Sequence, residues 1–204
     1  MDELDKALGD ISSIRRQVAR TTEFRGYGPA TLAGTGLFAM LAAGAQDYWI
    51  PQPALHASEY VGLWCSTALL SAVLAGVQMY TRSRRIHSGL SDEMIHMAVE
   101  QFLPAVGAGL LLTVVLLRAV PGLAWMLPGI WQVIFSLGIF ASCRFLPRPI
   151  MLAGVWYLFA GLLCIGLGGS RALSPWAMAI PFGAGQMLVA GILFFSARES
   201  GDEG

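Results

Sequence analysis

The stretch FLPAVGAGLLLTVVLLRAV, residues 102–120, decides the fold class of this chain. Its only charged residue, Arg118, lies close to its end. A helix of about 20 apolar residues is long enough to cross the hydrocarbon core of a bilayer. A helix of this length in a soluble protein would need a polar face, which this stretch lacks. The segment is therefore predicted to span a membrane.

Five further apolar runs have similar length, and none carries an acidic or basic residue near its centre. With the first, they give six predicted spans, at residues 27–46, 60–80, 102–120, 125–145, 150–167 and 176–197. Hydrophobic residues make up 55% of the 204 residues and charged residues 13%, so little remains for a soluble domain. The sequence predicts an all-α, multi-pass membrane protein built from three helical hairpins.

The basic residues are distributed unevenly between the two ends of the predicted spans. Eleven of the 13 Lys and Arg residues fall at one end, and only Arg118 and Arg171 fall at the other. By the positive-inside rule, both termini are expected in the cytoplasm of a bacterium, with the spans in its inner membrane. Residues 1–10 lack the basic region of a secretory signal, so the first span is expected to stay in the mature protein.

The first 25 residues differ in character from the rest of the chain. Their apolar residues recur every three or four positions and form one stripe on a helix: Leu4, Leu8, Ile11, Ile14 and Val18. This cytoplasmic amphipathic helix either packs on the ends of the spans or the lipid surface, or pairs with a partner helix. The predicted organisation is an amphipathic helix at 1–25, a transmembrane domain at 26–198 and a cytoplasmic tail at 199–204.

A short motif recurs at the cytoplasmic end of every odd-numbered span. The pattern P-x-x-x-A-G begins at Pro29, Pro104 and Pro149. The even-numbered spans carry Trp64, Trp131 and Trp176 near their outer ends. This common phase indicates a repeated hairpin with a quasi-threefold arrangement, in which small residues allow close helix contacts.

One polar segment interrupts the sixth span and is the first candidate binding site. Proline removes a backbone hydrogen bond and two glycines relax the helix, while an amide enters the hydrocarbon region: Pro181, Gly183, Gly185 and Gln186. Gln132, in the fourth span, is a second amide of interest. The segment is either a broken helix that presents backbone groups to a ligand or a kink packed against a neighbouring helix.

The second candidate site is a cluster of charged residues expected at the cytoplasmic boundary. Its members are Arg25, Arg82, Glu93, His96, Glu100, Arg144 and Arg148. Imidazole and carboxylates can bind a metal ion, but the arginines favour ion pairs instead. Glu100 is expected to pair with an arginine of this cluster, and neither a metal nor a cofactor is predicted.

Catalytic motifs give no support for an enzyme. The sequence has no G-x-S-x-G, no H-E-x-x-H and no phosphate-binding glycine loop, and no histidine lies in a predicted span. The three cysteines lie within predicted spans and are interpreted as small packing residues: Cys65, Cys143 and Cys164. The chain is therefore predicted not to be an enzyme.

Five stretches carry a resemblance to a known group of proteins. They are FRGYGPATLA (24–33), SGLSDEMIH (88–96), AVEQFLP (98–104), FASCRFLPR (140–148) and SPWAM (174–178). The chain resembles an uncharacterised family of six-helix bacterial inner-membrane proteins, and more loosely the HdeD-like three-hairpin proteins. The first resemblance implies no activity, but it implies pairing with a small winged-helix regulator. The second carries over no function, because the P-x-x-x-A-G motif is not part of that family's pattern.

Function is expected to follow from the cytoplasmic face. We expect a sensor or regulatory scaffold that contacts a protein partner, such as a transcriptional regulator or a second copy of itself, without binding nucleic acid directly. The alternative is a carrier for a small uncharged or weakly polar solute, centred on residues 181–186. Polar groups converging with Gln186 on a cavity would favour the carrier, and a tightly packed bundle would favour the scaffold.

Overall fold

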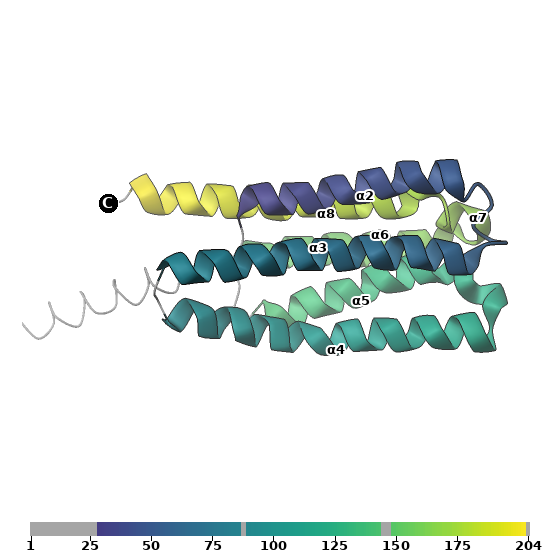
Figure 1. Ribbon diagram of the computed structural model, residues 1–204, viewed down its shortest axis with the longest axis horizontal. Coiled ribbons are helices and arrows are strands. Elements are labelled where there is room, and N and C mark those ends of the chain that lie inside the picture. The colour runs from purple at the N-terminus through teal and green to yellow at the C-terminus, as the bar shows by residue number, and fades with distance from the viewer. Residues whose placement is uncertain (1–27, 87–88, 144–147, 203–204) are drawn as a thin grey trace, which may run out of the picture.

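The computed structural model describes residues 28–86, 89–143 and 148–202, with side chains at 28, 30–81, 96–143 and 149–194. All regular structure within these ranges is helical, which confirms the all-α prediction. Figure 1 shows the long helices side by side in one bundle: α2 (Pro29–Trp49), α3 (Ala57–Ile86), α4 (Gly89–Ala119), α5 (Leu127–Ser142), α6 (Met151–Leu167) and α8 (Pro175–Asp202). The predicted helix at residues 4–18 lies outside the described residues.

Four of these helices are long and apolar enough to cross a membrane. The candidate spans are Ala57–Thr81 in α3, His96–Ala119 in α4, Pro121–Ser142, which joins the 3-10 helix Pro121–Met126 to α5, and Gly169–Phe194, which joins residues 169–174 to α8. Helix α6 is apolar but has only 17 residues. Helix α2 has 21 residues but is less apolar, because it includes Thr35, Gln46 and Asp47. The four candidate spans support a multi-pass membrane protein.

The bundle has two distinct ends (Figure 1). Three connections lie at what we call the turn end: residues 50–56, the 3-10 helix η1 (Pro121–Met126), and residues 168–174 with the short helix α7 (Gly169–Ala172). The start of α2, the end of α3, the start of α4 and the end of α8 lie at the opposite end, called the terminal end. The sharp turn after α6 uses Gly168, whose φ of 65° is a conformation that suits glycine.

The helices follow chain order around the bundle, and the first and last close the circle. Helix α2 packs extensively on α8, and α5 packs extensively on α6. Helix α4 packs on α5, α3 packs mainly on α2, and α6 also contacts α8. The contact between α3 and α4 is slight. A regular threefold arrangement would make the three contacts between successive hairpins alike, but α3–α4 is slight whereas α5–α6 and α2–α8 are extensive.

Glycine allows the closest helix contacts in the bundle. A Cβ atom added at Gly129 of α5 would lie 2.7 Å from the carbonyl oxygen of Gly161 on α6. Between α2 and α8, a Cβ at Gly36 would lie 3.3 Å from the carbonyl oxygen of Gly183. Both contacts bring backbone against backbone, which is the role of small residues between membrane helices.

Helices α3 and α4 leave most of their apolar side chains exposed. Leu69, Leu70 and Val73 of α3 and Leu110 and Leu111 of α4 are all more than half exposed. In a bilayer such surfaces lie against lipid tails and need no protein partner. The exposed apolar faces are therefore the expected outer surface of a membrane protein.

The hairpin motif makes similar contacts in the first two hairpins and different contacts in the third. Gly34 of α2 faces Leu74 of α3, and Gly109 of α4 faces Ile134 of α5. Gly154 of α6 instead packs on Phe140 of α5, in the preceding hairpin. The third motif thus serves the α5–α6 contact rather than the contact within its own hairpin.

Several helix ends differ from those expected. The outer loop predicted around residues 47–59 is shorter, because α2 continues to Trp49 and α3 begins at Ala57. Helix α4 begins at Gly89, well before the predicted span at 102–120, and runs through Pro104. Helix α8 continues to Asp202, beyond the predicted span. The helices extend beyond the apolar runs because helix formation does not require apolar side chains, and residues such as Arg198 and Glu199 in α8 favour it.

Candidate functional site

Helix α8 passes through Pro181 without ending, and a side chain from α5 replaces the lost backbone hydrogen bond. Because proline has no N–H, the carbonyl of Ala177 one turn earlier lacks its helical partner. The Nε2 of Gln132 donates to that carbonyl oxygen at 2.8 Å. Gln132 is fully buried, and its amide also lies 3.7 Å from the sulfur of Met178. The sequence flagged Gln132 and Pro181 separately, and the structure joins them in one contact.

The rest of the predicted binding segment is also packed against neighbouring helices. The indole N–H of Trp156 on α6 donates to the carbonyl oxygen of Pro181 at 2.9 Å. The ring of Phe182 lies 5.5 Å from that of Phe135 and 5.1 Å from that of Tyr157, measured between centroids. The carbonyl groups of Ala177 and Pro181 and the ring of Phe182 are therefore all in contact with neighbouring helices.

Gly185 and Gln186, the last two residues of the predicted segment, lie against α6 and α2, respectively. A Cβ at Gly185 would come within 2.5 Å of the Tyr157 hydroxyl, so glycine makes room for the tyrosine ring. The Gln186 side chain lies beside the same hydroxyl, although the two do not meet the geometry of a hydrogen bond. Gln186 is half-buried, with its Cβ against the α2 backbone at Gly36.

Among the residues whose side chains are described, four buried polar atoms lack a hydrogen-bond partner. They are the hydroxyl oxygens of Tyr60, Ser136 and Tyr157 and the Oε1 of Gln132. Helices α5 and α8 both start at the turn end, so Ser136, one turn after Gln132, lies near the level of Pro181. An unpaired polar atom in a dry interior costs about 1–3 kcal/mol. These atoms are the feature of the interior most like a solute site.

At the turn end, Gln46 links three parts of the bundle. Its Nε2 donates to the carbonyl oxygen of Leu173 at 2.8 Å, and its Oε1 accepts from the indole N–H of Trp64 at the same distance. The residue is 1% exposed. A similar contact joins α4 and α5, where the indole N–H of Trp131 donates to Thr113 at 2.8 Å. Trp176, the third tryptophan of the repeat, is exposed.

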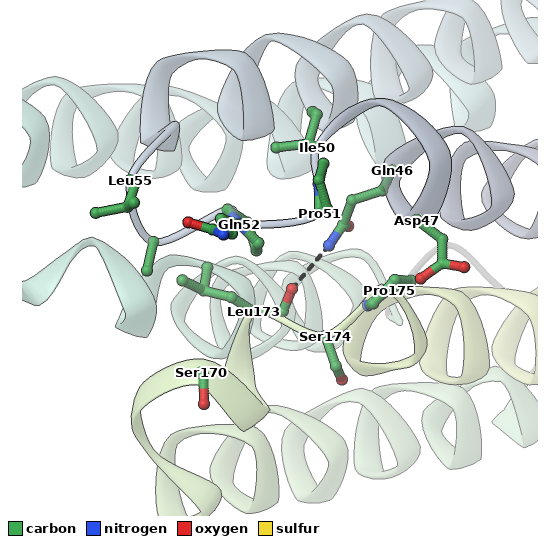
Figure 2. A pocket seen from close by; sticks show the side chains of 12 residues that line it. Gln46, Asp47, Ile50, Pro51, Gln52, Leu55, Ser170, Leu173, Ser174 and Pro175 are labelled. Atoms are coloured by element: carbon green, nitrogen blue, oxygen red, sulfur yellow. Dashed lines mark hydrogen bonds between the residues drawn. The ribbon is translucent and has the colours of Figure 1, made fainter.

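A pocket of about 350 Å³ opens beside Gln46, between the α2–α3 connection and the start of α8. Figure 2 shows Asp47 at one edge beside Pro175, Leu55 at the opposite edge, and the bond from Gln46 to Leu173 between them. Ile50, Pro51, Gln52, Ser170 and Ser174 complete the labelled lining. No residue of the 181–186 segment lines this pocket.

The charged cluster of the terminal end is only partly described. The Nε2 of His96 lies 3.3 Å from a carboxylate oxygen of Glu100, one turn away on α4, and both side chains are more than half exposed. The side chains of Arg25, Arg82, Glu93, Arg144 and Arg148 lie outside the described residues, so pairing of Glu100 with an arginine stays a prediction. Within the described ranges, no three His, Cys, Asp or Glu residues form a group able to hold a metal ion.

Sequence reasoning missed Gln46, Asp47 and Tyr157. Gln46 and Asp47 were assigned to the boundary of the first span, where polar residues are unremarkable. The contact of Gln132 could have been predicted from the sequence. Pro181 leaves the Ala177 carbonyl without its helical partner, and Gln132 is one of the few amides within the spans that could donate to it. No family model, curated protein or solved structure matches this chain.

Proposed function

We propose that this chain is a non-enzymatic protein of the bacterial inner membrane with six spans. In this proposal it is a sensor or regulatory scaffold that presents its terminal end to a cytoplasmic protein. Four candidate spans support the membrane location, and α2 and α6 lie in the same bundle beside them. The neighbours of α2 and α6 on both sides are long helices, which supports counting them as the fifth and sixth spans.

The observation that carries this proposal is that the carbonyl groups around Pro181 are hydrogen-bonded to neighbouring helices. A transport site built on a broken helix presents free backbone groups to its substrate. Here Gln132 donates a hydrogen bond to the Ala177 carbonyl, and Trp156 donates one to the Pro181 carbonyl. A kink whose polar groups are bound by neighbouring helices supports a structural role for the segment, and it favours the scaffold over the carrier.

The charge distribution supports an interaction on the cytoplasmic side. Eleven of the 13 basic residues flank the terminal end in the sequence, which the positive-inside rule places in the cytoplasm. The proposed partner is a protein, either a regulator of the kind implied by the sequence resemblance or a second copy of this chain.

Site-specific crosslinking tests the proposal in native membranes. A photoreactive amino acid replaces His96, which is exposed at the terminal end, and a matched control replaces Leu55, which is exposed at the turn end. The expected result is a discrete adduct at position 96 that is absent at position 55, and its mass separates a partner protein from a second copy. Absence of an adduct at position 96 in membranes of the native host would contradict the proposal.

The amphipathic segment provides a second arm of this test. A variant lacking residues 2–22 is expected to lose the adduct while remaining monodisperse and helical in detergent. Retention of the adduct would show that the segment does not bind the partner, and loss of the folded protein would assign the segment to the structure of the bundle.

The carrier is the second candidate, and the unpaired interior atoms favour it. The Oε1 of Gln132 and the hydroxyls of Ser136 and Tyr157 could bind a small uncharged solute during passage. Proteoliposome swelling with glycerol or urea tests this function. A carrier would accelerate swelling and lose the effect in Ser136→Val, whereas a scaffold would match protein-free liposomes.

A further inference from the structure

The pocket at the turn end has a single unpaired charge. The Asp47 carboxylate has neither a hydrogen bond nor an ion pair within the described residues, and its side chain is exposed. The other described carboxylate of this end, Glu59, lies 3.1 Å from the imidazole of His56. Arg118 and Arg171 are the described basic residues of this end, and neither lines the pocket. The lining therefore carries a net negative charge.

The remainder of the lining is mostly apolar. Ile50, Leu55, Leu173 and three proline rings line the pocket without offering side-chain hydrogen bonds. The Gln46 amide is already committed through both of its polar atoms, to Leu173 and to Trp64. Among the side chains of the lining, free polar groups are limited to Asp47, Gln52 and two serines. A volume of about 350 Å³ lies within the range of small-molecule sites.

From this combination we infer that the turn-end pocket binds an ammonium group attached to an apolar chain or ring. The carboxylate pairs with the ammonium, and the proline and aliphatic side chains contact the apolar part. The carboxylate disfavours anions, and the apolar lining favours a ligand with an apolar part. This inference rests on the proposed sensor function, because it names the class of ligand that the sensor recognises.

The aromatic end of α2 places this site at the level of lipid headgroups. Tyr48 and Trp49 are 82% and 69% exposed, and such residues concentrate at membrane interfaces. The ammonium can therefore come from a free amphipathic amine or from the ethanolamine headgroup of a lipid. Both sources share the chemistry that Asp47 recognises.

Binding at this place would act on α2 and α8, which pack extensively on each other. The floor of the pocket is the bond between Gln46 of α2 and Leu173, two residues before α8 begins. A ligand seated between the α2–α3 connection and Pro175 contacts both helices at once. Displacement of α8 relative to α2 then reaches the terminal end, where α8 extends to Asp202.

Ligand binding in neutral maltoside detergent tests the free-amine source. Phenylethylammonium serves as the probe, with phenylethanol and phenylpropionate as its neutral and anionic analogues. The ammonium is expected to raise the midpoint of thermal unfolding by about 4 °C at tenfold excess over its dissociation constant. The two analogues are expected to leave it unchanged. Equal stabilisation by phenylethanol would overturn the inference, because the site would then not recognise charge.

Three variants separate the pocket from general binding. Asp47→Asn should weaken phenylethylammonium binding about tenfold or more, as expected when a charge-assisted contact is lost. Gln52→Trp, in the exposed loop, should fill the pocket and abolish binding. Glu59→Gln is the matched control at the same end and should bind normally. Full binding by folded Asp47→Asn protein would also overturn the inference.

Native mass spectrometry distinguishes the lipid source. Phosphatidylethanolamine bound in preference to phosphatidylglycerol by the wild type, but not by Asp47→Asn, would identify the headgroup as the occupant. Amine binding without lipid preference would identify a free amine, and absence of both would refute the site. These measurements need no protein partner, and crosslinking at position 96 needs no ligand, so the two proposals can fail separately.

Discussion

Two parts of this bundle use apolar helices in opposite ways. In the candidate spans that contain α5 and α8, 44% and 39% of the most apolar window is buried, against 11% in α3 and 6% in α4. We call α2–α8 and α5–α6 the packed pairs, and α3 with α4 the peripheral pair. All four spans have similar hydropathy, between 1.7 and 2.0. Hydropathy therefore selects helices for the membrane but does not decide which of them pack together.

Small residues account for the difference. In the packed pairs, a Cβ at Gly129 or Gly161 would collide with the facing helix, and a Cβ at Gly36 would lie only 3.3 Å from the α8 backbone. Gly62 and Gly76 of α3 have no other atom within 4 Å of an added Cβ. Between membrane helices lipid tails compete with apolar side chains, so close backbone contact, rather than hydrophobicity, stabilises a pair.

The largest expected effect comes from Gly129→Val. The added side chain would meet Ile165 and the carbonyl oxygen of Gly161, so α5 and α6 would have to separate. We expect a loss of about 3 kcal/mol in the free energy of unfolding, measured in detergent with a denaturant. Gly76→Val is the matched control on the peripheral pair and should change stability by less than about 0.5 kcal/mol. Equal effects would remove the distinction between the two parts.

A double-mutant cycle on Gln132 and Pro181 should give the next largest effect. Gln132→Leu leaves the Ala177 carbonyl unpaired and is expected to cost about 2 kcal/mol of stability. Pro181→Ala restores an N–H able to reach that carbonyl along the helix. Gln132→Leu should therefore cost clearly less in the Pro181→Ala background. Additive effects would show that the amide does not compensate for the proline.

Two hydrogen bonds from tryptophan side chains allow a further comparison: Trp64 to Gln46 between α3 and α2, and Trp131 to Thr113 between α5 and α4. Gln46→Leu removes the amide that bonds to both Trp64 and Leu173. We expect it to lower the free energy of unfolding by about 1.5 kcal/mol, in the upper part of the range for hydrogen bonds between membrane helices. Thr113→Val removes only the acceptor of Trp131, at a cost of about 0.6 kcal/mol. Thermal unfolding followed by tryptophan fluorescence measures both. A larger loss from Thr113→Val would mean that the α4–α5 contact is the more important of the two.

Glu100→Gln is expected to have the smallest effect. The described contact of Glu100 is an exposed pair with His96, and such pairs contribute little. We expect a change below about 0.5 kcal/mol in the free energy of unfolding. A loss well above that value would show that an arginine of the terminal end is a further partner. The control is Glu59→Gln, which alters a similar exposed pair at the turn end.

The sequence predicted the helices well because apolar runs and helix signals are local. Each long helix overlaps one of the six apolar runs, and the alternative of a segment packed against a neighbouring helix at Pro181 agrees with the hydrogen bonds there. The unequal packing of the helices could not be predicted, since it depends on which glycine faces which neighbour. Gly34, Gly109 and Gly154 occupy the same position in the repeated motif but do not face equivalent helices.

The candidate site was less predictable than the fold. Gln132 and Ala177 lie 45 residues apart, and only the order of helices around the bundle brings them together. Asp47 gives no signal in the sequence, because a carboxylate just beyond a span is common. Its isolation follows from the pairing of Glu59 with His56 and from the path of the α2–α3 connection.

The closure between the first and last long helices also determines the order of assembly. Gln46 and Leu173 are 127 residues apart, so α2 leaves the ribosome well before its closest neighbour exists. At about 5–20 residues per second, α2 spends on the order of ten seconds in the membrane without that neighbour. During biogenesis its glycine face must therefore be covered by lipid, by the insertion machinery or by a temporary helper, and α8 completes the protein by displacing that cover.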